Sequence, residues 1–136
     1  MITPATANAI ANGGNFVACA VLPRDVTMKI YHNADYTAAE KKSGMNKEAD
    51  VAWRMMGIVG GAGAIGLSIA GRTAKGDDLK MINAAVCASS CAGAGIFLTN
   101  DFMKNDIKPE MRYLNLGVNL GLAAFAGHEL IKSMQK

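Results

Sequence analysis

Three stretches of the chain carry no charged residue over a length that suits a lipid bilayer. They cover residues 55–71, 81–100 and 113–128, and Glu129 follows the third. A helix needs about 17–25 predominantly apolar residues to cross a hydrocarbon core of roughly 30 Å. Between residues 56 and 70 only Ser68 is polar, whereas a soluble helix repeats polar residues every three or four positions. The pattern therefore predicts an all-α membrane protein.

We predict three transmembrane helices in up-down-up order, with spans at about 53–72, 80–100 and 110–131. The links between them are short and polar, as helical hairpins require. Asn46 is a suitable N-cap for the first long helix, and Pro109 suits the first turn of the third. Residues 47–136 would thus form one three-helix transmembrane bundle.

Residues 1–46 are predicted to form an N-terminal surface arm that lies on the membrane or against a partner. The first 23 residues are uncharged, but prolines, asparagines and glycines interrupt their apolar character. A basic start and a strongly apolar middle, which a signal peptide would show, are missing. A fourth span or a residual targeting segment is the alternative for this stretch.

The charges are modest and mixed in sign: 14 Lys and Arg stand against 11 Asp and Glu, for a net charge of +3. The longest basic run is Lys41-Lys42, so the concentrated basic face of a nucleic-acid-binding protein is missing. Nine basic residues fall on the arm and the second link, and five fall on the opposite side. By the positive-inside rule, the N-terminus would face the cytoplasm, stroma or matrix.

Small residues recur at four-residue steps in all three predicted spans. Such spacing lets helix backbones approach closely, which is how helices associate in lipid. Three helices packed on one another need fewer small faces than this, so some should meet other subunits or flat cofactors. The predicted helix-packing residues are Gly57, Gly61, Gly66, Gly95, Gly117 and Gly121.

Few polar groups lie within the spans. Asn83 and Asn115 are expected to form hydrogen bonds between helices, because a buried amide in lipid needs a partner. His128, beside Glu129, either contacts water at the interface or is an axial ligand to a metal-centred macrocycle. Cys87 and Cys91 stack on one helical face, where packing suits them better than a disulfide or a metal site.

The residues of the spans also bear on which classes of function are expected. No catalytic motif and no convergent set of acids, bases or nucleophiles is present, so we expect no enzyme activity. Carriers and channels place charge or broken helices at the midplane, and these spans have neither charge nor proline there. A small oligomeric pore remains an alternative, lined by Ser68, Ser89, Ser90 and Asn119. The leading hypothesis is a non-catalytic accessory subunit that braces a large membrane complex.

The Gly/Ala-rich spans 55–71 and 81–100, with His128 near a membrane face, resemble the small accessory membrane subunits of algal photosystem I. This resemblance implies a thylakoid location, other membrane subunits as partners, and bound chlorophyll, carotenoid and lipid. It also implies chlorophyll-binding roles for His128, Asn83 and Asn115. The Glu-x-x-Asn/His-x-Arg pattern of light-harvesting antenna helices is missing, which argues against that family. An accessory subunit of a mitochondrial respiratory complex or ATP synthase, in the inner membrane, is the alternative.

These features predict that the purified chain needs detergent. Its three uncharged stretches have no side that tolerates water, so the chain should aggregate when detergent is removed. Size-exclusion chromatography with and without mild detergent measures this. A monodisperse species in plain buffer would contradict the membrane assignment and each role built on it.

Overall fold

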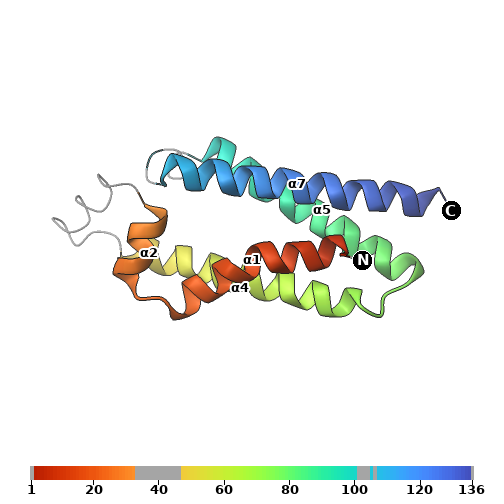
Figure 1. The fold of residues 1–136 in the computed structure, drawn as a ribbon, viewed down its shortest axis with the longest axis horizontal. Helices are drawn as coiled ribbons and strands as arrows, with labels where there is room; N and C mark the ends of the chain where they lie inside the picture. The colour runs from red at the N-terminus through yellow and green to blue at the C-terminus, as the bar shows by residue number, and fades with distance from the viewer. Residues whose placement is uncertain (1, 33–46, 101–104, 106, 136) are drawn as a thin grey trace.

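Four long helices run side by side along the long axis of the molecule in the computed structural model (Figure 1). The structure describes residues 2–32, 47–100, 105 and 107–135. Within them no strand is present, and the helices are α1 (Pro4–Val21), α2 (Arg24–Tyr31), α4 (Lys47–Gly71), α5 (Gly76–Thr99) and α7 (Pro109–Met134).

The four long helices form two antiparallel pairs, in which α1 packs along α4 and α5 packs along α7. In the first pair, Gly57 lies against Cys19, whereas Gly71 lies against Ala5 at the opposite end. In the second pair, the Cys87 thiol donates to the backbone oxygen of Ala123 at 3.5 Å. A short link joins α4 to α5, so the chain reverses direction from each long helix to the next (Figure 1).

Residues 4–21 differ from the predicted surface arm, because they form α1 within the bundle. Thr3 is the N-cap, and its side chain accepts from the Thr6 backbone N–H at 3.2 Å. Pro4 then occupies the first turn, where a missing N–H costs nothing. Two glycines and three asparagines lower the helix propensity of this segment, so packing against α4 supplies stability that the isolated helix lacks.

The two predicted spans with the longest apolar runs are helices of the expected length. Arg54–Gly71 and Gly76–Thr99 are the two helical segments, among the described residues, that are long and apolar enough to cross a membrane. The third predicted span is also helical, as α7 (Pro109–Met134), but it falls short of the same apolar standard. Its two asparagines and its C-terminal charges explain the difference. The predicted N-cap Asn46 lies outside the described residues.

Arg54 joins α4 to the end of α1. Its guanidinium donates to the backbone oxygens of Cys19 and Leu22, at 3.2 and 3.0 Å, and to the Thr27 hydroxyl at 3.1 Å. The last turn of α1 contains no basic residue of its own. Since helix C-terminal carbonyls lack partners within the helix and carry partial negative charge, a cation from α4 satisfies both needs.

The end of α2 in turn joins the second pair. The backbone N–H of Lys108 donates to the Tyr31 backbone oxygen at 2.9 Å, and the Lys108 ammonium donates to the Lys29 backbone oxygen. His32 and Ile107 form an isolated antiparallel bridge beside these bonds. The short α2 therefore connects both helix pairs at one end of the bundle.

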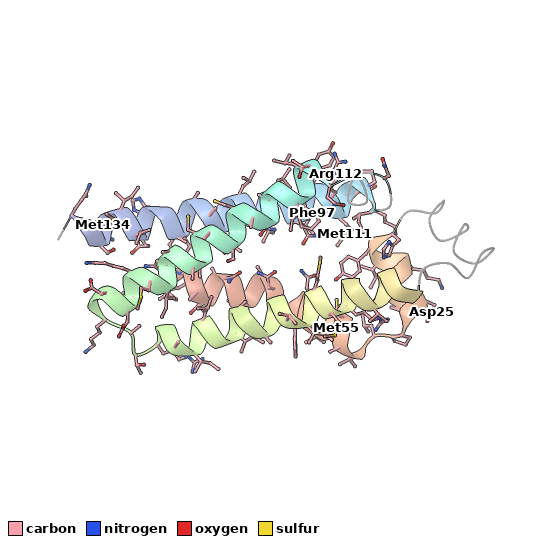
Figure 2. The ribbon with its side chains drawn as sticks, turned by 180° about the vertical axis from the view of Figure 1, so that it is seen from behind. Asp25, Met55, Phe97, Met111, Arg112 and Met134 are labelled. Atoms are coloured by element: carbon pink, nitrogen blue, oxygen red, sulfur yellow. The ribbon has the colours of Figure 1, made fainter. Side chains whose placement is uncertain are left out.

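The buried apolar core is small, and large apolar side chains cover the outside. Two clusters of buried residues lie between the pairs: one contains Ala18, Tyr31 and Ile107, and the other contains Ala5, Val86 and Ala126. The outward side chains, by contrast, project from all four long helices (Figure 2). Exposed fractions are 69% for Ile10, 53% for Met55, 63% for Met81 and 52% for Leu120.

Gly61 should be the most sensitive glycine of the first pair. A Cβ there would lie 3.1 Å from the Asn12 backbone oxygen and closer still to the Phe16 side chain. We expect Gly61→Ala to destabilise the protein by about 1–3 kcal/mol through overpacking. Thermal unfolding in detergent, followed by circular dichroism, measures this.

Gly66→Ala is the matched control on the same helix, because a Cβ at Gly66 meets no atom within 4 Å. Its higher helix propensity should leave the protein equally or slightly more stable. Equal losses of stability in the two variants would contradict the close contact between α1 and α4.

Candidate functional site

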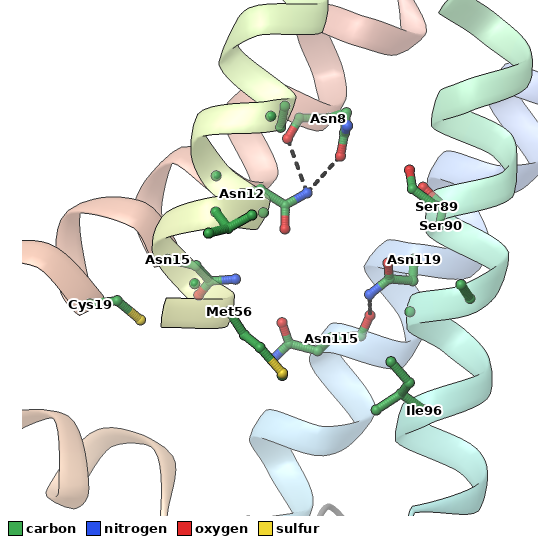
Figure 3. Close-up of a pocket in the computed structure, with 18 of the residues that line it drawn as sticks. Asn8, Asn12, Asn15, Cys19, Met56, Ser89, Ser90, Ile96, Asn115 and Asn119 are labelled. Atoms are coloured by element: carbon green, nitrogen blue, oxygen red, sulfur yellow. Dashed lines mark hydrogen bonds between the residues drawn. The ribbon is translucent and has the colours of Figure 1, made fainter. Parts of the chain in front are cut away.

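A cavity of about 530 Å³ lies between the two helix pairs (Figure 3). All four long helices contribute to its walls, and Tyr31 of α2 lines one end. We call it the inter-pair cavity. Amide and hydroxyl side chains, small residues and a few large apolar side chains make up its lining.

The α1 wall is a row of asparagines. Asn8, Asn12 and Asn15 follow the i, i+4, i+7 spacing that places residues on one helical face. The Asn12 amide nitrogen donates to the Asn8 side-chain oxygen at 2.6 Å and to the Asn8 backbone oxygen at 3.2 Å. The Tyr31 hydroxyl donates to the Asn15 side-chain oxygen at 3.0 Å. The amide row is thus held within α1, as Figure 3 shows for Asn12 and Asn8, and by the Tyr31 hydroxyl at its other end.

The α7 wall carries two more asparagines. The amide nitrogen of Asn115 donates to the Met111 backbone oxygen at 2.7 Å, and that of Asn119 donates to the Asn115 backbone oxygen at 2.8 Å. A Cβ at Gly93 of α5 would lie 2.5 Å from the Asn119 side-chain oxygen. Glycine at this position therefore makes room for the Asn119 amide between α5 and α7.

The α5 wall presents two serines. The Ser89 hydroxyl donates to the Val86 backbone oxygen at 3.1 Å, so it is used within its own helix. Ser90 is only 2% exposed and lines the cavity, yet its hydroxyl forms no hydrogen bond with any other residue that the structure describes. The oxygen of this hydroxyl is not fully enclosed, so the small exposed part of Ser90 includes the hydroxyl, which opens to the cavity.

The cavity is uncharged. None of the described residues that line it is Asp, Glu, Lys, Arg or His. Nor does any group of three or more His, Cys, Asp or Glu side chains within the described residues form a metal-binding cluster. This arrangement offers neutral hydrogen-bond donors and acceptors beside apolar surface.

The predicted cofactor residues do not converge. Asn115 lines the inter-pair cavity, whereas neither Asn83 nor His128 does. Asn83 is 4% exposed, and its side-chain oxygen has no hydrogen-bond partner among the described residues. His128 is exposed on α7. Sequence spacing placed these residues on helices, but it did not show which faces meet.

Three of the four residues proposed to line an oligomeric pore, Ser89, Ser90 and Asn119, line this cavity within a single chain. Ser68 instead is buried, and its hydroxyl donates to the Thr6 hydroxyl oxygen at 3.5 Å. The sequence reading missed the α1 asparagines as site residues. Their i, i+4, i+7 spacing was the signal that could have found them.

The predicted packing glycines fall into two groups. Gly57 and Gly61 lie against α1, where an added Cβ would press on Cys19 and Phe16. A Cβ at any of the remaining four would meet no described atom of another segment within 4 Å; these are Gly66, Gly95, Gly117 and Gly121. No other helix among the described residues packs against them.

The described residues thus define a helical bundle with two helices able to cross a membrane and an uncharged central cavity. Comparison with protein-family models, curated proteins and solved structures found no match.

Tyr31, at the end of the cavity, should titrate late. Burial raises the pKa of its hydroxyl above the ordinary value of 10.0, and the nearby Cys19 raises it further. Because the folded-state pKa is the higher one, the folded protein holds this proton more tightly than the unfolded chain. The protonated Tyr31 hydroxyl therefore adds to the free energy of unfolding in full below about pH 10. This contribution is lost as pH rises through the raised pKa.

Ultraviolet absorbance of tyrosinate against pH, in detergent, tests this expectation. Tyr31→Phe should remove a late-titrating component and lessen the loss of stability above pH 10. Tyr113→Phe is the control: it removes an exposed tyrosine and leaves Tyr31 in place. A late component that persists in Tyr31→Phe would show that another group is responsible.

Proposed function

We propose that this chain is a membrane-embedded, non-catalytic accessory subunit that braces a larger multi-subunit complex. The observation that supports this most directly is the inverted distribution of side chains around the bundle. Amides and serines turn toward the inter-pair cavity, while large apolar side chains cover the outside of every long helix. That distribution suits hydrocarbon surroundings and would expose an extensive apolar surface to water.

The positions of the charges also support a membrane location, with the long axis of the bundle running across the bilayer. Lys29, Arg54, Lys108 and Arg112 lie toward one end of the long axis. The link after α4 and the start of α5 carry Arg72, Lys75, Asp77, Asp78 and Lys80 at the opposite end. Between these ends, α1 and the middle of α4, α5 and α7 carry no charge. At 1.5 Å per residue, 17 uncharged residues of α4 extend about 25 Å, close to the thickness of a hydrocarbon core.

The open glycines support a bracing role. Gly66, Gly95, Gly117 and Gly121 occupy three helices, and each has free space where a side chain would be. Small residues on outward faces allow neighbouring membrane helices to approach closely. We propose that these faces contact other membrane subunits, with lipid covering the remainder of the apolar surface.

The finer proposal follows the resemblance to accessory subunits of algal photosystem I. It assigns the chain to a thylakoid complex, with chlorophyll and carotenoid as associated pigments. His128 is exposed on α7 and so remains accessible to a pigment or subunit outside the chain. An accessory role in a mitochondrial inner-membrane complex is the alternative.

A native gel of mildly solubilised membranes, combined with an absorbance spectrum, tests both the bracing role and the assignment to a photosynthetic complex. We expect the chain to migrate in a large pigmented complex. A large colourless complex would keep the bracing role and move it to the mitochondrial alternative. A small homo-oligomer would contradict bracing and favour the pore, and absence from the membrane fraction would overturn the proposal.

A variant of α7 sharpens this test. The double substitution Gly117→Leu/Gly121→Leu should reduce incorporation into the large complex at least several-fold, because bulk on the open face keeps a partner helix away. The control Gly60→Leu adds the same side chain where a Cβ also has free space, but on the cavity wall. Equal incorporation of both variants would show that the α7 face is not an interface.

A further inference from the structure

We propose that the inter-pair cavity binds an uncharged, lipid-soluble molecule whose polar end carries carbonyl or hydroxyl oxygens. This goes beyond the bracing role, and it uses the proposed membrane location only as the source of the ligand. The cavity volume, about 530 Å³, falls in the range of small-molecule sites, roughly 300–1,000 Å³.

The Ser90 hydroxyl is the first observation that points to a ligand. Ser90 is 2% exposed on the cavity wall, and its hydroxyl has no hydrogen-bond partner in the described part of the chain. A hydroxyl that faces a largely apolar cavity without a hydrogen-bond partner costs free energy. A ligand oxygen at this wall would supply that partner.

The asparagine rows provide further polar contacts. The Asn12 amide nitrogen is used by Asn8, which leaves the Asn12 side-chain oxygen as an acceptor. The Asn15 side-chain oxygen is used by Tyr31, which leaves its amide N–H groups as donors. Both rows face the cavity from opposite sides (Figure 3). The site therefore offers neutral donors and acceptors together.

The remaining walls of the cavity favour an apolar, uncharged body for the ligand. Val59, Ile96 and Phe97 give apolar surface, and Gly60, on the α4 wall, leaves space beside them. With no charged residue in the lining, an ionic ligand would lose its hydration without gaining a counter-charge. These properties favour a neutral head group with an apolar body, such as a quinone ring and its tail.

The test uses the full chain in detergent micelles and decylubiquinone, an uncharged benzoquinone with a ten-carbon tail, as the probe. Equilibrium dialysis against empty micelles separates binding from partition. We expect saturation at about one probe per chain. Decylbenzene, which has the tail without the oxygens, should partition only, and so should the decanoate anion.

Four variants test whether the probe binds in the inter-pair cavity. Gly60→Leu should abolish saturable binding because its side chain occupies the cavity, whereas Gly66→Leu adds the same side chain to the same helix away from it. Ser90→Ala should weaken binding about 3–10-fold by removing one hydrogen bond. Ser133→Ala, whose hydroxyl donates to the Leu130 backbone oxygen outside the cavity, should leave it unchanged.

Several outcomes would overturn the proposal. These are uptake equal to that of empty micelles, equal binding by Gly60→Leu and Gly66→Leu, saturable binding of decylbenzene, or unchanged affinity in Ser90→Ala. Because the assay uses the isolated chain, failure here leaves the native-gel result intact. Loss of the large complex in the gel likewise leaves the binding result intact.

Discussion

The close approach of α1 to α4 is the contact on which the rest of the structure depends. Gly57 and Gly61 remove the side chains that would separate the two helices, so Cys19 and Phe16 rest directly on α4. This contact fixes the rotation of α1 about its own axis. Since residues at i, i+4 and i+7 share a face, the same rotation turns the asparagines toward the second pair and leaves Ile10 and Val17 outside, 69% and 56% exposed. The cavity chemistry and the apolar exterior are two consequences of one helix contact.

The asparagine side chains of the interior form hydrogen bonds with their own helices, which lets polar groups lie inside a bundle with apolar surroundings. Asn12, Asn115 and Asn119 each donate to a backbone oxygen one turn earlier. Such bonds meet part of the hydrogen-bonding need of each amide without a partner helix. The Asn12 side-chain oxygen remains turned to the space between the pairs, whereas the Asn119 oxygen lies beside Gly93 of α5. An amide row can therefore line a cavity, where an unpaired charge could not.

The sequence predicted the helices whose evidence is local and missed the features that depend on which faces meet. The charge-free runs at 55–71 and 81–100 correspond to α4 and α5, because freedom from charge over that length is a property of each segment alone. In α1, Asn8, Asn12 and Asn15 interrupt the apolar sequence, although the three share one face. Only the partner helix shows that this face is internal. The sequence pointed to Asn115 as a polar residue within a span. Only the arrangement of the two helix pairs shows that the α5 serines and the α1 asparagines line the same cavity.

The cavity remains open because the two pairs meet mainly at its two ends. At one end, Ala5 of α1 packs with Val86 of α5 and Ala126 of α7. At the opposite end, Ala18 and Tyr31 pack with Ile107, supported by the backbone bond from Lys108 to Tyr31 and by the Arg54 guanidinium at the end of α1. These contacts at both ends set the spacing of the pairs, and the walls between them do not meet. Small residues on α4 and α5 do not fill the gap, and among the described residues no hydrogen bond joins the α1 asparagines to those of α7 across it. The open space is thus a product of where the pairs touch, and its polar lining is a product of how α1 is turned.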